Sequence, residues 1–261
     1  MKQVLALDFD GVIADSLMEC LFVGFNTYIH FNKDTRLFGG QKLTFENFND
    51  LTEKNSKAVN IYKELRPYVI DAFCYYVIAH IIDNNITVKT QDHYGQIREK
   101  LKQNIHQDFI KIFYEQRKCL IDTNFDEWMG LIRPFDNIID AIKKLRSKFM
   151  LAVATNNRAF TIEAFMKKFD ITPDIITDSS LSVDKKLQID NIKSRLNVGF
   201  EDIHFVDDQV KNFNNVFPLG VKCYVANWGY TTKEQLEEAK SKDIKILEQD
   251  DFYNVFSSIT N

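Results

Sequence analysis

The stretch that decides the fold lies near the start of the chain and reads Val4-Leu5-Ala6-Leu7-Asp8-Phe9-Asp10-Gly11. Its first four residues are apolar without alternation, which is typical of a strand buried on both faces of a parallel sheet. Two carboxylates follow directly, and Gly11 permits a tight bend after them. Carboxylates at the mouth of a buried strand are costly unless they are paired or bind a metal ion. Asp8 and Asp10 are therefore candidates for a functional site.

The same pattern of an apolar strand that ends in polar residues recurs twice. One predicted strand covers residues 149–154 and ends at Thr155 and Asn156, and another covers residues 203–206 and ends at Asp207 and Asp208. Further strands are predicted at 174–177 and 221–226, with helices at 137–148, 158–169 and 185–196. Alternating strands and helices predict an α/β fold with a Rossmann-like, doubly wound parallel sheet. Such sheets place their ligand site at the carboxyl ends of the strands, where the strand order reverses.

Residues 16–130 have a different pattern. No strand is predicted there, and apolar residues recur at steps of three and four, which predicts helices over 66–83 and 95–118. We therefore expect a core domain of residues 1–15 and 131–261, with an inserted all-α cap domain of residues 16–130 that would cover the site. Within the insertion, Trp128 is expected in the hydrophobic core. Glu19 is expected either at a hinge or solvated in the first turn of a helix.

Composition limits the class of protein. The 261 residues are 45% hydrophobic and 27% charged, which excludes disordered and fibrous classes. A formal net charge of −4 gives no broad attraction to nucleic acid or to acidic membranes. No apolar run approaches the roughly 20 residues that cross a bilayer. The four cysteines are widely spaced without a CxxC pair, so we expect a cytoplasmic protein with reduced, buried thiols.

The polar residues at the strand ends point to a cation. Several converging carboxylates would repel one another strongly without one. Oxygen ligands with no histidine or cysteine nearby favour Mg²⁺ over Zn²⁺. A lysine beside such a site would balance charge and could hold a phosphate, and either Lys185 or Lys186 could supply it. The hydroxyl of Thr155 and the amides of Asn156 could also contact phosphate oxygens.

Four of these segments resemble the motifs of the haloacid dehalogenase-like (HAD) hydrolases. Asp8-Phe9-Asp10-Gly11-Val12 is similar to motif one, and Ala154-Thr155-Asn156 is similar to motif two. Lys185 resembles the lysine of motif three, and Phe205-Val206-Asp207-Asp208, with Asn212 four residues on, resembles motif four. The order and spacing are those of the family. A helical insertion between motifs one and two resembles the C1 cap of its phosphoglycolate phosphatase-like branch.

This resemblance implies a Mg²⁺-dependent phosphatase that hydrolyses a small phosphomonoester through an aspartyl-phosphate intermediate. Asp8 would be the nucleophile and a metal ligand. Asp10 would be the general acid and base, and its backbone carbonyl would also bind the metal. The remaining metal ligand would be Asp208, with Asp207 as second choice.

The phosphate contacts that the resemblance implies are Thr155, Lys185 and, more weakly, Asn156. The sequence leaves open whether Lys185 or Lys186 takes this role. In the cap, Arg117 could bind a second anionic group of the substrate. The expected partner is a small phosphorylated metabolite, and the chain would be a monomer or a homodimer.

Two alternatives remain. One is a phosphomutase or phosphotransferase of the same family, in which another hydroxyl replaces water. The other is a catalytically silent scaffold that binds a phosphometabolite or a protein. A dehalogenase is not favoured, because members of that branch lack the second acid of motif one, and Asp10 is present here.

Overall fold

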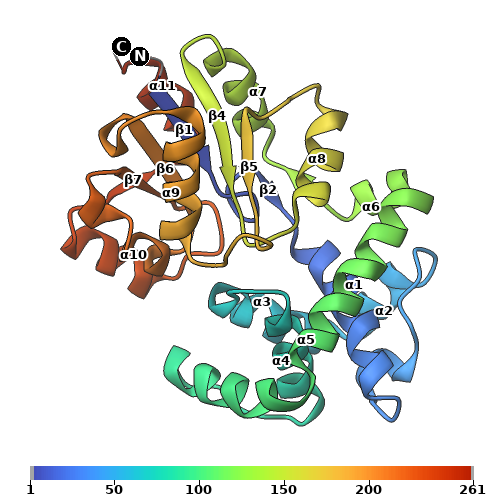
Figure 1. Ribbon diagram of the computed structural model, residues 1–261. Helices are drawn as coiled ribbons and strands as arrows, with labels where there is room; N and C mark the ends of the chain where they lie inside the picture. The colour runs from blue at the N-terminus through green and yellow to red at the C-terminus, as the bar shows by residue number, and fades with distance from the viewer. Residues whose placement is uncertain (1–2, 260–261) are drawn as a thin grey trace. The chain divides into compact units, whose positions relative to one another are not determined.

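The computed structural model describes residues 3–259 (Figure 1). The chain divides into two compact units. One contains the residues up to Asp15 and those from Arg133 onward, and the other is Ser16–Ile132. The first unit is built on a parallel sheet, whereas the second contains helices and irregular segments.

The sheet has six parallel strands in the order β5-β4-β1-β6-β7-β8. Their bounds are β1 Gln3–Leu7, β4 Phe149–Ala154, β5 Ile175–Thr177, β6 Ile203–Asp207, β7 Lys222–Ala226 and β8 Lys245–Leu247. The strand order reverses at β1, because β4 and β5 lie to one side and β6, β7 and β8 lie to the other. The predicted α/β fold class is confirmed. The carboxyl ends of β1, β4 and β6 meet at the reversal, which is the usual place for a ligand site.

Both faces of the sheet are buried. In β1, Val4 and Ala6 belong to an apolar cluster that includes Ile189 of one helix and Ala239 of another. Leu5 and Leu7, which point to the opposite face of the sheet, are also buried. This explains the continuous apolar run in the sequence. The helices of this unit are α7 (Asp136–Leu145), α8 (Ala159–Lys168), α9 (Lys185–Leu196), α10 (Lys233–Ser241) and α11 (Phe252–Ser257).

A short antiparallel ribbon marks where the insertion leaves and rejoins the sheet unit. It pairs β2 (Ala14–Asp15) with β3 (Arg133–Pro134). Gly11 adopts a positive φ of 84° in the turn between β1 and this ribbon, a conformation that side chains disfavour.

The helical unit contains α1 (Leu17–Phe31), α2 (Phe48–Lys54), α3 (Ser56–Leu65), α4 (Phe73–Asp83), α5 (Gln91–Thr123) and α6 (Phe125–Gly130). Helices α1, α4 and α5 pack against one another around buried aromatic rings. The rings of Phe73 and Phe109 lie 6.1 Å apart, and those of Tyr75 and Phe113 lie 5.4 Å apart. Trp128 is fully buried, as expected. Among the helices that the structure describes, none is both long and apolar enough to cross a membrane.

Some element bounds differ from those predicted. The predicted helix over 66–83 begins only at Phe73, because Arg66–Tyr68 forms a separate 3-10 turn and Val69 is extended (φ −66°, ψ 133°). Helix α5 is longer than predicted at both ends, and β8 was not anticipated. Three cysteines are buried, whereas Cys119 is exposed, contrary to expectation.

Candidate active site

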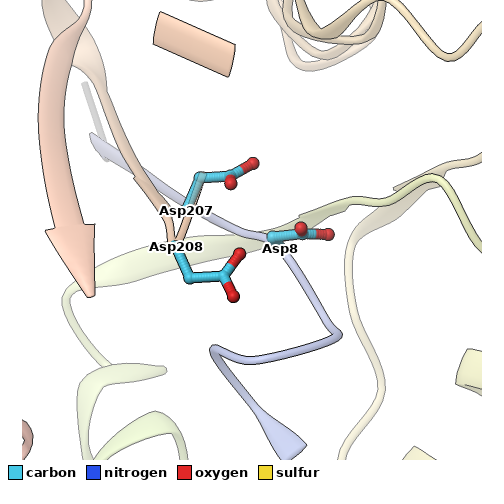
Figure 2. Close-up of side chains that lie close together, drawn as sticks. All are labelled: Asp8, Asp207 and Asp208. Atoms are coloured by element: carbon cyan, nitrogen blue, oxygen red, sulfur yellow. The ribbon is translucent and has the colours of Figure 1, made fainter. Parts of the chain in front are cut away.

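Three carboxylates gather at the reversal of the strand order. Asp8 follows β1, Asp207 is the last residue of β6, and Asp208 comes next. One oxygen from each lies within 4.8 Å of the others (Figure 2). All three side chains are buried. The pairing of β1 with β6 causes this convergence and extends one residue beyond β1, since the amide of Asp8 donates to the carbonyl oxygen of Val206 at 2.9 Å.

Lys185 is the cation that the structure places among these carboxylates. Its Nζ lies 3.2 Å from Asp8 Oδ1 and 3.4 Å from Asp207 Oδ2, and it donates to the carbonyl oxygen of Ala154 at 2.6 Å. The side chain is 2% exposed. Lys186 instead pairs with Asp190 at 2.7 Å, where both side chains are partly in solvent. Of the two adjacent lysines, therefore, only Lys185 reaches the carboxylate cluster.

The electrostatic balance of the cluster is negative. Burial raises the pKa of Asp8, and the attraction of Lys185 does not offset burial together with the repulsion from Asp207 and Asp208. The pKa of Asp8 therefore lies well above its usual range. Burial lowers the pKa of Lys185, but Asp8 and Asp207 raise it by more, so the ammonium stays charged. With all three carboxyl groups ionised, the single lysine would leave two negative charges to be balanced.

A divalent cation fits this balance and this donor set. The ligand atoms are carboxylate oxygens within 4.8 Å of one another, and a hard cation such as Mg²⁺ prefers oxygen ligands. A bound cation would also lower the pKa of Asp8 by stabilising its ionised form. The cluster of Asp8, Asp207 and Asp208 could therefore hold a metal ion.

Asp207 and Asp208 have different protein partners. Asp207 accepts two hydrogen bonds of 2.9 Å from Nδ2 of Asn212 and one of 2.8 Å from the amide of Gln209. Asp208 accepts a 2.7 Å hydrogen bond from the amide of Tyr230. Asp207 is thus oriented by its own loop, whereas Asp208 is held by the loop that follows β7.

Two glycines make room for Asp208. A Cβ at Gly11 would lie 2.1 Å from Asp208 Oδ2, and one at Gly229 would lie 2.5 Å from the Cβ of Asp208. Any side chain at either position would collide with the carboxylate. Tyr230 also anchors the loop that follows β7, because its hydroxyl donates to the carboxylate of Asp15 at 2.6 Å. The sequence prediction missed Gly229 and Tyr230, although the consecutive Trp228-Gly229-Tyr230 just after a predicted strand was an available signal.

The turn after β4 brings the predicted phosphate contacts to the same end of the sheet. Thr155 is fully buried, and its hydroxyl oxygen accepts from the amide of Asn157 at 3.0 Å. Asn157 in turn donates from Nδ2 to Asp10 at 3.4 Å, so it links this turn to the second carboxylate of the first motif. Asn156 is partly exposed, and its Oδ1 lies 3.2 Å from Nε2 of Gln188. Asn157 and Gln188 were not predicted as site residues.

Arg117 lies in the helical unit and does not form an open anion receptor there. Its Nε and Nη2 donate to the two carboxylate oxygens of Glu19 at 2.7 and 2.6 Å. Glu19 also accepts from Nε1 of Trp128 at 3.1 Å, and both charged side chains are almost fully buried. The guanidinium is therefore neutralised inside the unit, which argues against the predicted substrate role. Glu19 is buried, so the expectation of a solvated carboxylate is wrong, and its role at a hinge stays a prediction.

Comparisons by sequence give no relatives. No protein-family model matches the chain, and no curated protein sequence matches it.

Comparison with solved structures finds chains of the same architecture. A protein provisionally assigned as a phosphoglycolate phosphatase from Lactobacillus delbrueckii subsp. bulgaricus superposes with a TM-score of 0.67 at 15% identity, covering 98% of this chain and 99% of that one. A predicted phosphoglycolate phosphatase from Haemophilus somnus gives a TM-score of 0.61 at 14% identity, covering 97% of each chain. A HAD-superfamily hydrolase of subfamily IA, variant 1, from Geobacter sulfurreducens gives 0.56 at 12% identity, covering 98% and 96%.

These likenesses establish the fold. It is that of the haloacid dehalogenase-like hydrolases of subfamily IA, with a helical region inserted between β1 and β4. The resemblance recognised in the sequence motifs is confirmed at this level.

Proposed function

We propose that the chain is a Mg²⁺-dependent phosphatase that hydrolyses a small phosphomonoester through an aspartyl-phosphate on Asp8. The observation that carries the proposal is the cluster of Asp8, Asp207, Asp208 and Lys185 at the strand reversal, with buried carboxylate oxygens within 4.8 Å. The fold and the four ordered motifs support the same reading.

The proposed metal ligands are Asp8, the backbone carbonyl of Asp10, and Asp208, with Asp207 as second choice. When bound, the ion would supply positive charge that offsets the repulsion between Asp8 and a phosphate dianion. Lys185 would supply a second positive charge and hold Asp8 in position through the 3.2 Å contact.

The chemistry then takes two steps. In the first, a carboxylate oxygen of Asp8 attacks phosphorus in line, and the bond from phosphorus to the alcohol oxygen breaks. Asp10 gives its proton to the departing oxygen. In the second, Asp10 takes a proton from water, and the water oxygen attacks the same phosphorus. Phosphate leaves and the Asp8 carboxylate is restored.

The turn after β4 would bind the phosphoryl oxygens during both steps. The Thr155 hydroxyl and the Asn156 amides are suitable donors, and Lys185 lies beside the same turn through its bond to Ala154. We propose that residues 16–130 form a cap domain that selects the substrate. A small phosphorylated metabolite is the class of substrate that this arrangement favours.

The experiment is hydrolysis of p-nitrophenyl phosphate with Mg²⁺ and after chelation by EDTA. We expect release of p-nitrophenol and of free phosphate that depends on Mg²⁺. Asp8→Asn should abolish turnover while circular dichroism and thermal unfolding show an intact fold. A matched control is Asp190→Asn, which changes a partly exposed aspartate on α9 whose side chain pairs with Lys186.

Three outcomes would change the proposal. Normal turnover by Asp8→Asn would refute the assignment of Asp8 as the nucleophile. Transfer of the phosphoryl group to an added alcohol, without free phosphate, would favour a phosphotransferase. A folded wild-type chain with no turnover on a panel of phosphorylated sugars, glycolate, nucleotides and amino-acid phosphates would favour a binding scaffold.

A further inference from the structure

Gln188 is a fully buried polar residue next to the proposed phosphate-binding turn. It lies on α9, three residues after Lys185, so both side chains leave the same face of the helix. Its Nε2 donates to the carbonyl oxygen of Thr155 at 2.9 Å and to that of Ser182 at 2.7 Å, and it lies 3.2 Å from Oδ1 of Asn156.

Lys185 and Gln188 together hold consecutive peptide groups. Lys185 donates to the carbonyl oxygen of Ala154, the last residue of β4, and Gln188 donates to that of the next residue, Thr155. The first turn of α9 therefore fixes the backbone at the point where the strand ends and the turn begins. Through Ser182 it also fixes the segment that leads into α9.

The orientation of the Gln188 amide follows from its neighbours. Three oxygen acceptors surround Nε2, so exchanging the nitrogen and the oxygen would bring Oε1 against all three. Among the described residues Oε1 has no hydrogen-bond partner, although it is buried. An unpaired buried oxygen is destabilising, and an apolar side chain would avoid that cost. A cost of this kind is expected where a polar group serves a function.

The contact with Asn156 has a consequence for the ligand. Because Oδ1 of Asn156 lies 3.2 Å from Nε2 of Gln188, this contact fixes which end of the Asn156 amide is the oxygen and which end is the nitrogen. That end of the side chain is a hydrogen-bond donor, which suits a phosphoryl oxygen, whereas the oxygen would repel it.

We propose that Gln188 is a positioning residue for phosphate binding: it fixes the Thr155 carbonyl and turns the Asn156 amide so that its donor faces the phosphate. This inference rests on the proposed phosphatase function. Gln188 itself does not touch the phosphate. Its effect passes through the turn, so it should act on substrate affinity more than on the chemical step.

The test compares Gln188→Met and Gln188→Glu with the wild type. Methionine keeps the length and bulk but removes the donors, whereas glutamate keeps the shape and places oxygen against three acceptors. The matched control is Gln235→Met, because Gln235 is also a buried glutamine in the first turn of a helix, α10, where it takes part in a capping box with Thr232. Two readouts apply: binding of inorganic phosphate with Mg²⁺ by calorimetry, and KM and kcat for p-nitrophenyl phosphate.

We expect Gln188→Met to weaken phosphate binding about five- to tenfold, the effect of about one lost hydrogen bond, and to raise KM by the same factor. Its kcat should stay within about twofold of wild type, because the bound substrate and the transition state lose the same interaction. Gln188→Glu should bind phosphate still more weakly, and Gln235→Met should bind phosphate with the affinity of the wild type. A merely structural role would lower the thermal midpoint and kcat while leaving KM and phosphate affinity unchanged.

The outcomes separate the two proposals. If the wild type binds phosphate and turns over but Gln188→Met matches it in affinity and KM, the positioning role is overturned and the phosphatase stands. If the folded wild type neither binds phosphate nor turns over, the phosphatase proposal fails, and the role of Gln188 fails with it.

Discussion

Asn212 donates from Nδ2 to both carboxylate oxygens of Asp207, at 2.9 Å each. Lys185 lies 3.4 Å from the same carboxylate, so Asp207 is held between a neutral donor and a buried cation. Its neighbour Asp208 is instead held through Oδ2 by the amide of Tyr230. Two adjacent aspartates at one strand end therefore have separate supports, and we expect them to have separable roles.

Asp208→Asn should impair Mg²⁺ binding more than Asp207→Asn. Asp208 is our first choice as a metal ligand, whereas Asp207 accepts three hydrogen bonds within its own loop and would mainly orient Lys185. We expect the Mg²⁺ concentration for half-maximal activity to rise about 100-fold in Asp208→Asn and about tenfold in Asp207→Asn, the latter being typical for groups that orient ligands. Metal titrations of activity, with Mg²⁺-dependent thermal shifts as a second readout, measure this. The reverse order would make Asp207 the main ligand.

Lys185→Met should reduce kcat/KM by about 10² or more, because it removes a positive charge beside the attacking carboxylate and the phosphate. It should also destabilise the fold, since the buried Asp8 and Asp207 lose their only cation among the described contacts. Lys186→Met is the matched control: its pair with Asp190 is partly exposed and should contribute about 0.5 kcal/mol or less. Steady-state kinetics and urea unfolding of both variants test the difference. Equal losses in the two variants would contradict the assignment of Lys185.

The strands and the acidic cluster were predictable because local sequence determines both. A strand buried on two faces must be apolar throughout, as in residues 149–154, and parallel strands bring their polar ends together. The choice between Lys185 and Lys186 was not predictable, because it depends on the rotation of α9 relative to β4. Gln188 was equally hidden, since two of its three acceptors are backbone carbonyls, which no side-chain pattern encodes.

The helical unit was harder to predict for a related reason. Glu19 and Arg117 are 98 residues apart, and nothing in either local pattern indicates that they pair. Each residue taken alone has the pattern of a solvated helix face. Only the packing of α1 against α5 brings them together in an interior where neither charge is stable by itself.

Arg117→Met should therefore destabilise the protein by about 3–5 kcal/mol, because it leaves the Glu19 carboxylate buried without its cation. Adding Glu19→Leu should recover much of this loss, since an apolar pair of similar volume replaces the ions. Lys118→Met, next along α5 and in an exposed pair with Asp122, should change stability by about 0.5 kcal/mol or less. Urea unfolding gives the stabilities. KM for p-nitrophenyl phosphate in the double variant should match wild type, and a large increase would restore a substrate role for Arg117.

His204 should make stability depend on pH. It is buried in β6, with Nδ1 2.9 Å from the Tyr224 hydroxyl and Nε2 2.9 Å from Oε1 of Gln3. Burial, with a smaller effect of Lys222, lowers the pKa of His204 from 6.5 to about 4. The folded state therefore holds a neutral ring at a pH where the unfolded chain is already protonated. The contribution of the neutral His204 ring to the free energy of unfolding is complete above about pH 6.5 and is lost as the pH falls toward 4.

The size of this loss is at most about 3.4 kcal/mol, from 1.36 kcal/mol for each unit of the pKa difference between the folded and unfolded states. His204→Gln keeps a polar side chain but removes the titration, so its unfolding free energy should fall less steeply than that of wild type between pH 7 and 4. Carboxylates titrate in both proteins, and the difference between the two curves isolates the histidine. His30→Gln, at an exposed position on α1, is the matched control. Parallel curves for wild type and His204→Gln would show that the buried ring does not govern acid stability.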